Sequence, residues 1–102
     1  MTDLEKKFFQ EMKDIYTKAD KECGYRATRF LQMLGEKGGV DTAKSLISKP
    51  GGTEGFTKLW ELGRLNLSVE ALVIKEEFQS LFTKEEIESC KNRLKDYGYD
   101  QE

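Results

Sequence analysis

The sequence contains no histidine, so it lacks the side chain that proteins use most often as a general base near neutral pH and as a metal ligand. Sites that pair a serine or cysteine nucleophile with histidine cannot be built from this chain. The two cysteines, Cys23 and Cys90, are too few for a structural zinc site or an iron–sulfur cluster. We expect both to be buried thiols, and we expect neither a metal nor a cofactor.

Long apolar runs are also missing. The longest run of uncharged apolar residues is Ala71 to Ile74, whereas a membrane-spanning helix needs about 18–20 residues. Charge begins at Asp3, which is not the pattern of a signal peptide. We therefore expect a cytoplasmic protein that does not bind membranes.

Strand signals are absent too, and apolar residues instead recur at helical spacing. Thr2 with Glu5, and Thr83 with Glu86, form the capping boxes that begin the first and last expected helices. A chain of 102 residues has room for one core, so residues 1–102 are expected to form one all-α domain, a compact bundle of five to six helices. The expected helices cover residues 3–23, 27 to Gly35 or Gly38, 40–47, 54–62, 69–82 and 84–97, with the junction near residue 74 left open.

Glycine and positive charge concentrate in the middle of the chain. The block Cys23–Arg64 holds eight of the nine glycines and the only proline, and its net charge is +3. Residues 1–22 carry a net charge of −1 and residues 65–102 a net charge of −4. The acidic final third suits a face turned away from DNA or a face that meets a basic protein.

Residues 25–49 have the helix lengths and the glycine turn of a helix-turn-helix, in which the second helix enters the major groove of DNA. Asp41 would stand at the leading edge of that helix and repel phosphate, and two core helices joined by a tight turn fit the same pattern. An aromatic and basic cluster at residues 25–30 also suits unpaired bases and their phosphates. The candidate nucleic-acid contacts are Tyr25, Arg26, Arg29, Lys37, Thr42, Lys44 and Lys49.

A second interpretation is a protein-interaction module that docks on a larger partner, such as a nuclease, or forms a homodimer. An exposed apolar patch commonly marks such an interface. The candidate partner-binding residues are Phe56, Trp60, Phe78 and Phe82. The pattern alone places Trp60 in the core, so the sequence leaves this interpretation open.

An enzyme is not expected, because no pair of reactive groups converges in the sequence pattern. The segment Lys49–Gly55 contains glycines before a helix, as phosphate-binding loops do. It lacks the Walker spacing and the strand that precedes such a loop, so an interhelical loop is the plain interpretation.

Five segments resemble a family of small prokaryotic proteins of unknown function, and together they span most of residues 8–94. Proteins of this family occur alone or as tails and neighbours of restriction-type nucleases. The resemblance implies a defence or nucleic-acid setting, and it assigns no catalytic residue. The segments are Glu22–Leu34, Gly38–Lys44, Gly55–Leu65, Leu67–Val73 and Leu81–Ile87.

Overall fold

The computed structural model describes residues 2–50 and 52–99, which contain six α-helices, two short 3₁₀ helices and no strand. The expected all-α bundle is confirmed. Gly51 of the predicted loop, and Asp100 and Glu102 of the acidic final third, lie outside the described residues. No helix in the described part of the chain combines the length and the apolar character needed to cross a bilayer.

The two longest helices begin and end at the predicted signals. Helix α1 (Asp3–Cys23) starts with a capping box in which Thr2 Oγ1 accepts from the Glu5 N–H, and it ends at Gly24, whose φ of 68° is left-handed. Helix α6 (Lys84–Asp96) starts with the second box, between Thr83 and Glu86. Local sequence fixes these ends because the capping groups lie within three residues of the N–H groups that they satisfy.

Shorter elements lie between them. Helices α4 and α5 start where Thr53 and Ser68 each accept from the N–H three residues on, as their sequence predicts. The junction left open near residue 74 is a break, after which the chain continues as a 3₁₀ helix rather than as α5. The remaining bounds are α2 (Thr28–Lys37), α3 (Gly39–Ile47), α4 (Glu54–Glu61), η1 (Leu65–Leu67), α5 (Val69–Val73) and η2 (Glu76–Leu81).

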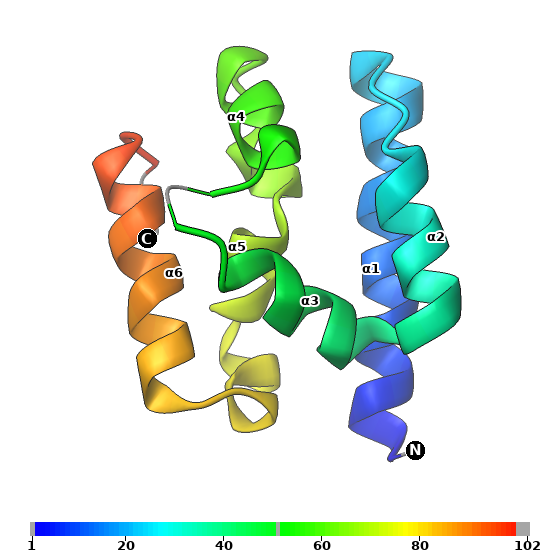
Figure 1. The fold of residues 1–102 in the computed structure, drawn as a ribbon, viewed down its shortest axis with the longest axis vertical. Coiled ribbons are helices and arrows are strands. Elements are labelled where there is room, and N and C mark those ends of the chain that lie inside the picture. Colours follow the sequence, from blue (N-terminus) through cyan, green and yellow to red (C-terminus); the bar gives the residue numbers. More distant parts are fainter. Residues whose placement is uncertain (1, 51, 100–102) are drawn as a thin grey trace.

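Helix α3 is the central element of the bundle. Figure 1 shows α1 and α2 side by side, α6 at the opposite side, and α3 crossing between them in front of α5. Helix α3 packs on α1, α2, α5 and α6. It can approach α1 closely because a Cβ on Gly39 would lie 3.1 Å from the Phe9 Cα.

The main core joins the start of α1 to the C-terminal half of the chain. The Phe8 ring meets the rings of Phe78 and Phe82 edge to face, with centroids 5.1 and 5.4 Å apart. A second cluster, which includes Phe56 and Leu94, fills the space beneath α4. Trp60 is not part of either core, because 46% of its surface is exposed, so its expected burial is wrong.

Candidate functional site

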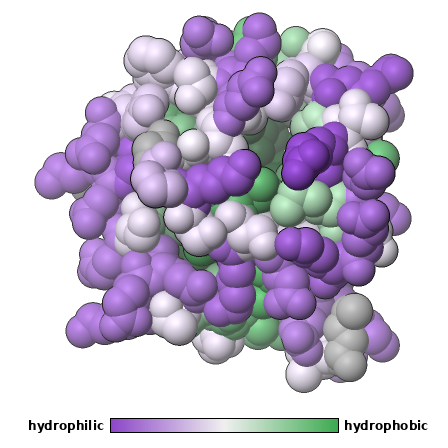
Figure 2. Space-filling view, viewed as in Figure 1, coloured by the Kyte–Doolittle hydropathy of each residue, from purple (hydrophilic) through white to green (hydrophobic). Residues whose placement is uncertain are grey.

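A groove opens between the α1–α2 pair and the column formed by α4, η1 and α5. Its volume is about 550 Å³, and the end of α3 closes one side. Figure 2 shows apolar atoms at the bottom of a hollow in this face, between α4 and α2, with hydrophilic atoms around it. The lining therefore combines an apolar floor with a polar rim, as ligand sites commonly do.

The floor and walls of the groove come from six helices and from the loops between them. Ile15 and Ala19 belong to α1, Phe30 to α2 and Leu46 to α3. Leu59 of α4 closes the far wall together with side chains of η1 and α5. No single segment of the sequence contains this surface, so it exists only once the helices have packed.

The rim of the groove is basic. Arg29 and Lys37 lie two turns apart on α2, Lys49 follows the end of α3, and all three residues are exposed. Lys37 donates a hydrogen bond to Ser45 Oγ at 3.2 Å, which holds its ammonium group at this edge. Among the described residues that line the groove, Glu54 is the one exposed acid. The rim therefore attracts anions.

Tyr25 stands against the start of α4. A Cβ on Gly55 would lie 3.2 Å from the Tyr25 hydroxyl, so this glycine leaves the space that the phenol occupies. Burial, and secondarily the negative charge of Glu54, raises the pKa of Tyr25 above 10.0. The half-buried ring presents a hydroxyl donor beside the apolar wall.

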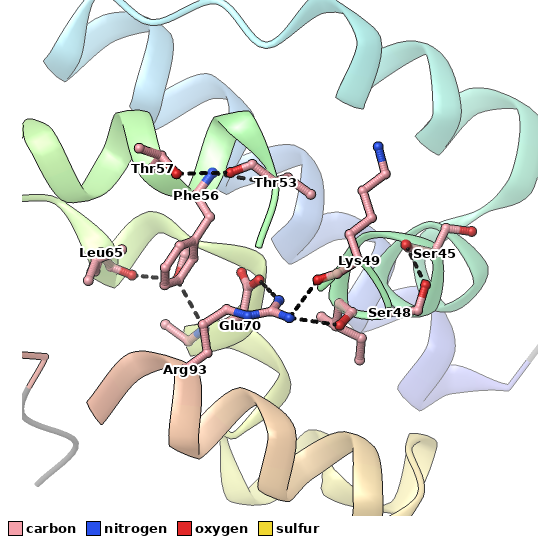
Figure 3. Close-up of polar contacts among 12 residues, drawn as sticks. Ser45, Ser48, Lys49, Thr53, Phe56, Thr57, Leu65, Glu70 and Arg93 are labelled. Carbon is pink, nitrogen blue, oxygen red and sulfur yellow. Dashed lines mark hydrogen bonds and ion pairs between the residues drawn. The ribbon is translucent and has the colours of Figure 1, made fainter. Parts of the chain in front are cut away.

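A buried ion pair closes the deep end of the groove. Glu70 is 2% exposed and lines the groove, and its Oε2 accepts from Arg93 Nη1 at 2.8 Å. Arg93 Nη2 also donates to the carbonyls of Ile47 and Lys49 (Figure 3), at 3.2 and 2.8 Å. Burial raises the pKa of Glu70, against the hydrogen bond and charge of Arg93. Arg93 thus links α6 to α5 and to the backbone of Lys49, whose side chain stands at the rim.

Four of the seven predicted nucleic-acid contacts line this groove: Tyr25, Arg29, Lys37 and Lys49. Arg26 is exposed but lies outside the groove, with its Nε 3.6 Å from Asp20 Oδ1. The fold thus brings together four predicted contact residues that are spread over residues 25–49 of the sequence.

Thr42 and Lys44 are placed differently from the expectation. Thr42 is fully buried, so its predicted contact with nucleic acid is wrong. Lys44 Nζ lies 2.8 Å from Glu86 Oε1 and 5.4 Å from the centre of the Phe82 ring. This ammonium group joins α3 to α6 instead of facing the groove.

The predicted helix-turn-helix segment does contain two helices, but its geometry is that of core packing. A single residue, Gly38, separates α2 from α3, where a helix-turn-helix has a turn of about 3–4 residues. The face of α3 that carries Gly39, Ala43 and Ile47 is buried against neighbouring helices. Helix α3 therefore acts as the scaffold of the groove.

The predicted partner-binding rings do not form one surface. Phe56, Phe78 and Phe82 are buried, with at most 8% of their surface exposed, so their expected role as surface contacts is wrong. Of these four rings Trp60 alone is exposed, and Leu62, two residues further along the chain, has 40% of its surface exposed. The apolar surface on α4 is thus smaller than the sequence suggested.

Sequence reasoning missed Glu70 and Arg93. A signal existed, because Glu70 is the one charge within the otherwise uncharged run Leu67–Ile74. An isolated acid among apolar neighbours at the start of a helix indicates a buried carboxylate with a partner. Its partner Arg93 lies 23 positions away and shows no such pattern.

The two thiols differ. Cys90 is fully buried, and burial raises its pKa to about 12. Cys23 is only half-buried, so the expectation of burial is wrong for it, and Arg64 Nη1 lies 3.8 Å from its sulfur. Neither belongs to a group of three or more potential metal ligands within residues 2–50 and 52–99.

Comparisons of the chain with protein-family models, with curated proteins and with solved structures find no match.

Proposed function

We propose that the protein is a non-enzymatic nucleic-acid-binding module and that its groove holds an unpaired strand. The observation that carries this proposal is the basic rim of Arg29, Lys37 and Lys49 above an apolar floor. Single-stranded nucleic acid is commonly bound by a basic groove that follows the phosphates and by aromatic side chains on which bases stack. Tyr25 and Phe30 supply rings in the same lining.

The form of nucleic acid follows from the position of α3. Duplex recognition by a helix in the major groove needs exposed polar side chains along that helix. Helix α3 instead buries Thr42 and pairs Lys44 with Glu86. A concave site with three cations at its rim suits a flexible strand whose bases turn inward.

The resemblance to proteins found beside restriction-type nucleases extends the proposal. It favours an accessory role in which this module holds a strand next to a nuclease, in the cytoplasm of a prokaryotic cell. No reaction step is assigned to this chain.

Docking of a protein partner on α4 is the second candidate function. The exposed Trp60 favours it, because large aromatic side chains are frequent anchors of protein interfaces. A larger partner or a second copy would cover this ring and Leu62. Analytical ultracentrifugation of the wild type and of Trp60→Ala tests the second copy, since a monomer at every concentration contradicts it.

An NMR titration with a short unpaired oligonucleotide and with the matching duplex, at low and at moderate salt, tests the first proposal. We expect amide shifts to cluster around the groove, to be larger for the unpaired strand, and to fade as salt rises because counterions are released. Shifts that favour the duplex, or no shifts with either form, would contradict the proposal.

Charge variants sharpen this test. Arg29→Gln and Lys49→Gln should each weaken binding and lower the salt slope by about 0.7, the contribution of one phosphate contact to a single strand. Lys84→Gln removes the same charge from the start of α6, away from the groove, and should leave binding unchanged. Equal losses in all three variants would mean that net charge, and not the groove, drives binding.

A further inference from the structure

The groove presents opposite charges at its two levels. Arg29, Lys37 and Lys49 form the exposed basic rim, whereas Glu70 lines the deep end with 2% of its surface exposed. Apolar side chains, including Phe30, lie in the same lining. A ligand that matches this arrangement has an anionic group outside, a flat apolar body, and an N–H donor at its inner end.

The Glu70 carboxylate is held in place as a hydrogen-bond acceptor. The hydrogen bond from Arg93 joins two side chains of which 10% and 3% are exposed, and the backbone N–H of Glu70 also donates to the carboxylate. A carboxylate has about four acceptor positions, so one further donor can still bind. Arg93 cannot turn away, because its other nitrogen is bound to the carbonyls of Ile47 and Lys49. In Figure 3 the carboxylate lies between Arg93 and the start of α4, which carries Thr53 and Phe56.

Nucleobases differ in what they offer to such a carboxylate. Glu and Asp accept a hydrogen bond from the amino group of cytosine, and uracil has a carbonyl oxygen at the same position. If uracil were bound here, its carbonyl oxygen and the Glu70 carboxylate would both be acceptors, so no hydrogen bond would form between them. Each would lose its hydrogen bonds to water without a replacement.

We propose that Glu70 is the specificity-determining residue of the groove, selecting an unpaired nucleotide whose base carries an amino group. In this arrangement the base lies against the apolar wall with its amino group at Glu70, and its phosphate meets the basic rim. This inference rests on the function proposed above and adds the class of base. An acidic peptide matches the rim alone, because its carboxylates bring a second negative charge toward Glu70.

Fluorescence anisotropy with labelled oligodeoxycytidine and oligodeoxyuridine of equal length, at equal low salt, tests the inference. The two strands share backbone and charge, so they differ only at the base edge. The wild type should bind the cytidine strand about tenfold more tightly, the discrimination typical of a good base contact. In Glu70→Gln the amide still offers an acceptor to Arg93 and can also donate, so the preference should disappear.

The outcomes separate the inference from the proposed function. Equal affinity of the wild type for both strands overturns the role of Glu70 and leaves nucleic-acid binding standing. Failure to bind either strand overturns both, and so does a clear preference for a poly-glutamate peptide over both strands. An Arg26→Gln variant, changed outside the groove, should keep the cytidine preference.

A second measurement covers the case in which Glu70→Gln does not fold. Cytidine and uridine monophosphates are titrated into the labelled wild type, and the amides of Val69 and Ala71, which flank Glu70, are followed. Larger shifts with cytidine monophosphate support the inference, and equal shifts overturn it. If a mononucleotide binds as tightly as the oligonucleotide, the proposal that the ligand is a strand is wrong, whereas the base preference of Glu70 still stands.

Discussion

At the scale of single residues, Thr42 stands out because its hydroxyl is buried without a hydrogen-bond partner among the described residues. A buried polar group without a partner costs free energy, because it has lost its hydrogen bonds to water. The side chain belongs to the central helix α3 and is fully buried. A residue of the same shape without the hydroxyl should therefore make the protein more stable.

We predict that Thr42→Val raises the free energy of unfolding by about 1 kcal/mol, because valine replaces the unpaired hydroxyl with a methyl group of similar size. Thr42→Ser is the matched control. It keeps the hydroxyl and removes the methyl group, so it should destabilise the protein. Urea denaturation of the three proteins measures both effects. A Thr42→Val protein less stable than the wild type would mean that the hydroxyl is satisfied in solution. Oligonucleotide affinity should be unchanged in Thr42→Val, because the residue lies outside the groove.

At the scale of elements, the crossing of α3 over α1 depends on Gly39. A Cβ at this position would meet backbone as well as side chain, since both the Phe9 Cα and the Phe8 Cδ2 would lie 3.1 Å away. Backbone atoms cannot rotate away as a flexible side chain does, so a methyl group would push the two helices apart.

We predict that Gly39→Ala lowers the free energy of unfolding by about 1–3 kcal/mol through this overpacking. Gly35→Ala provides the control within α2, where a Cβ would meet nothing within 4 Å. Alanine favours helix by about 0.8–1.0 kcal/mol over glycine, so the control should be stabilised. Thermal or urea unfolding compares the two variants. Equal and positive effects would show that the helices tolerate a larger separation at this crossing.

Element ends could be predicted from the sequence, whereas burial within elements was only partly predictable. Both capping boxes are found because their groups are three residues apart in the chain. Trp60 was misplaced because the buried stripe of α4 is narrow and is filled by Phe56 and Leu59. Which edge of such a stripe faces solvent depends on the position of α6, and no local pattern records that position.

At the scale of the whole molecule, the basic middle of the sequence becomes the rim of one groove. Arg29, Lys37 and Lys49 could be nominated from charge and glycine content alone. Their convergence depends on α4 and α5, which build the opposite wall, and on Arg93, which joins α6 to α3. Glu70 could not be assigned a role from sequence because its burial is created by this long-range packing.

Two carboxylates give the whole fold opposite responses to pH. Burial, only partly offset by Arg93, raises the pKa of Glu70 above 4.5. The contribution of Glu70 to stability is then fully present below 4.5 and is lost as the pH rises through the folded pKa. For Glu86, partial burial acts to raise the pKa, but hydrogen bonds from Lys44 and Thr83 outweigh it and lower the pKa. Its contribution is present above 4.5 and is lost as the pH falls through the folded pKa.

We predict that the stability of the wild type relative to Glu70→Gln declines as the pH rises above about 4.5, and that its stability relative to Glu86→Gln declines as the pH falls below about 4.5. Urea denaturation at a series of pH values measures both differences. Each variant serves as the control of the other, because the substitution is the same and the expected slopes are opposite. Parallel slopes would contradict the assignment of the two environments.

The exposed position of Trp60 also gives the molecule a built-in optical reporter. It is the only tryptophan of the chain, its ring lies edge to face with Tyr97 at 5.3 Å, and it does not line the groove. Its emission spectrum therefore reports how α4 sits on the last turn of α6. A ligand that fills a rigid groove should leave this emission spectrum unchanged. A shift in emission on binding would show that α4 moves relative to α6. A single fluorescence titration therefore distinguishes a preformed groove from one that changes shape on binding.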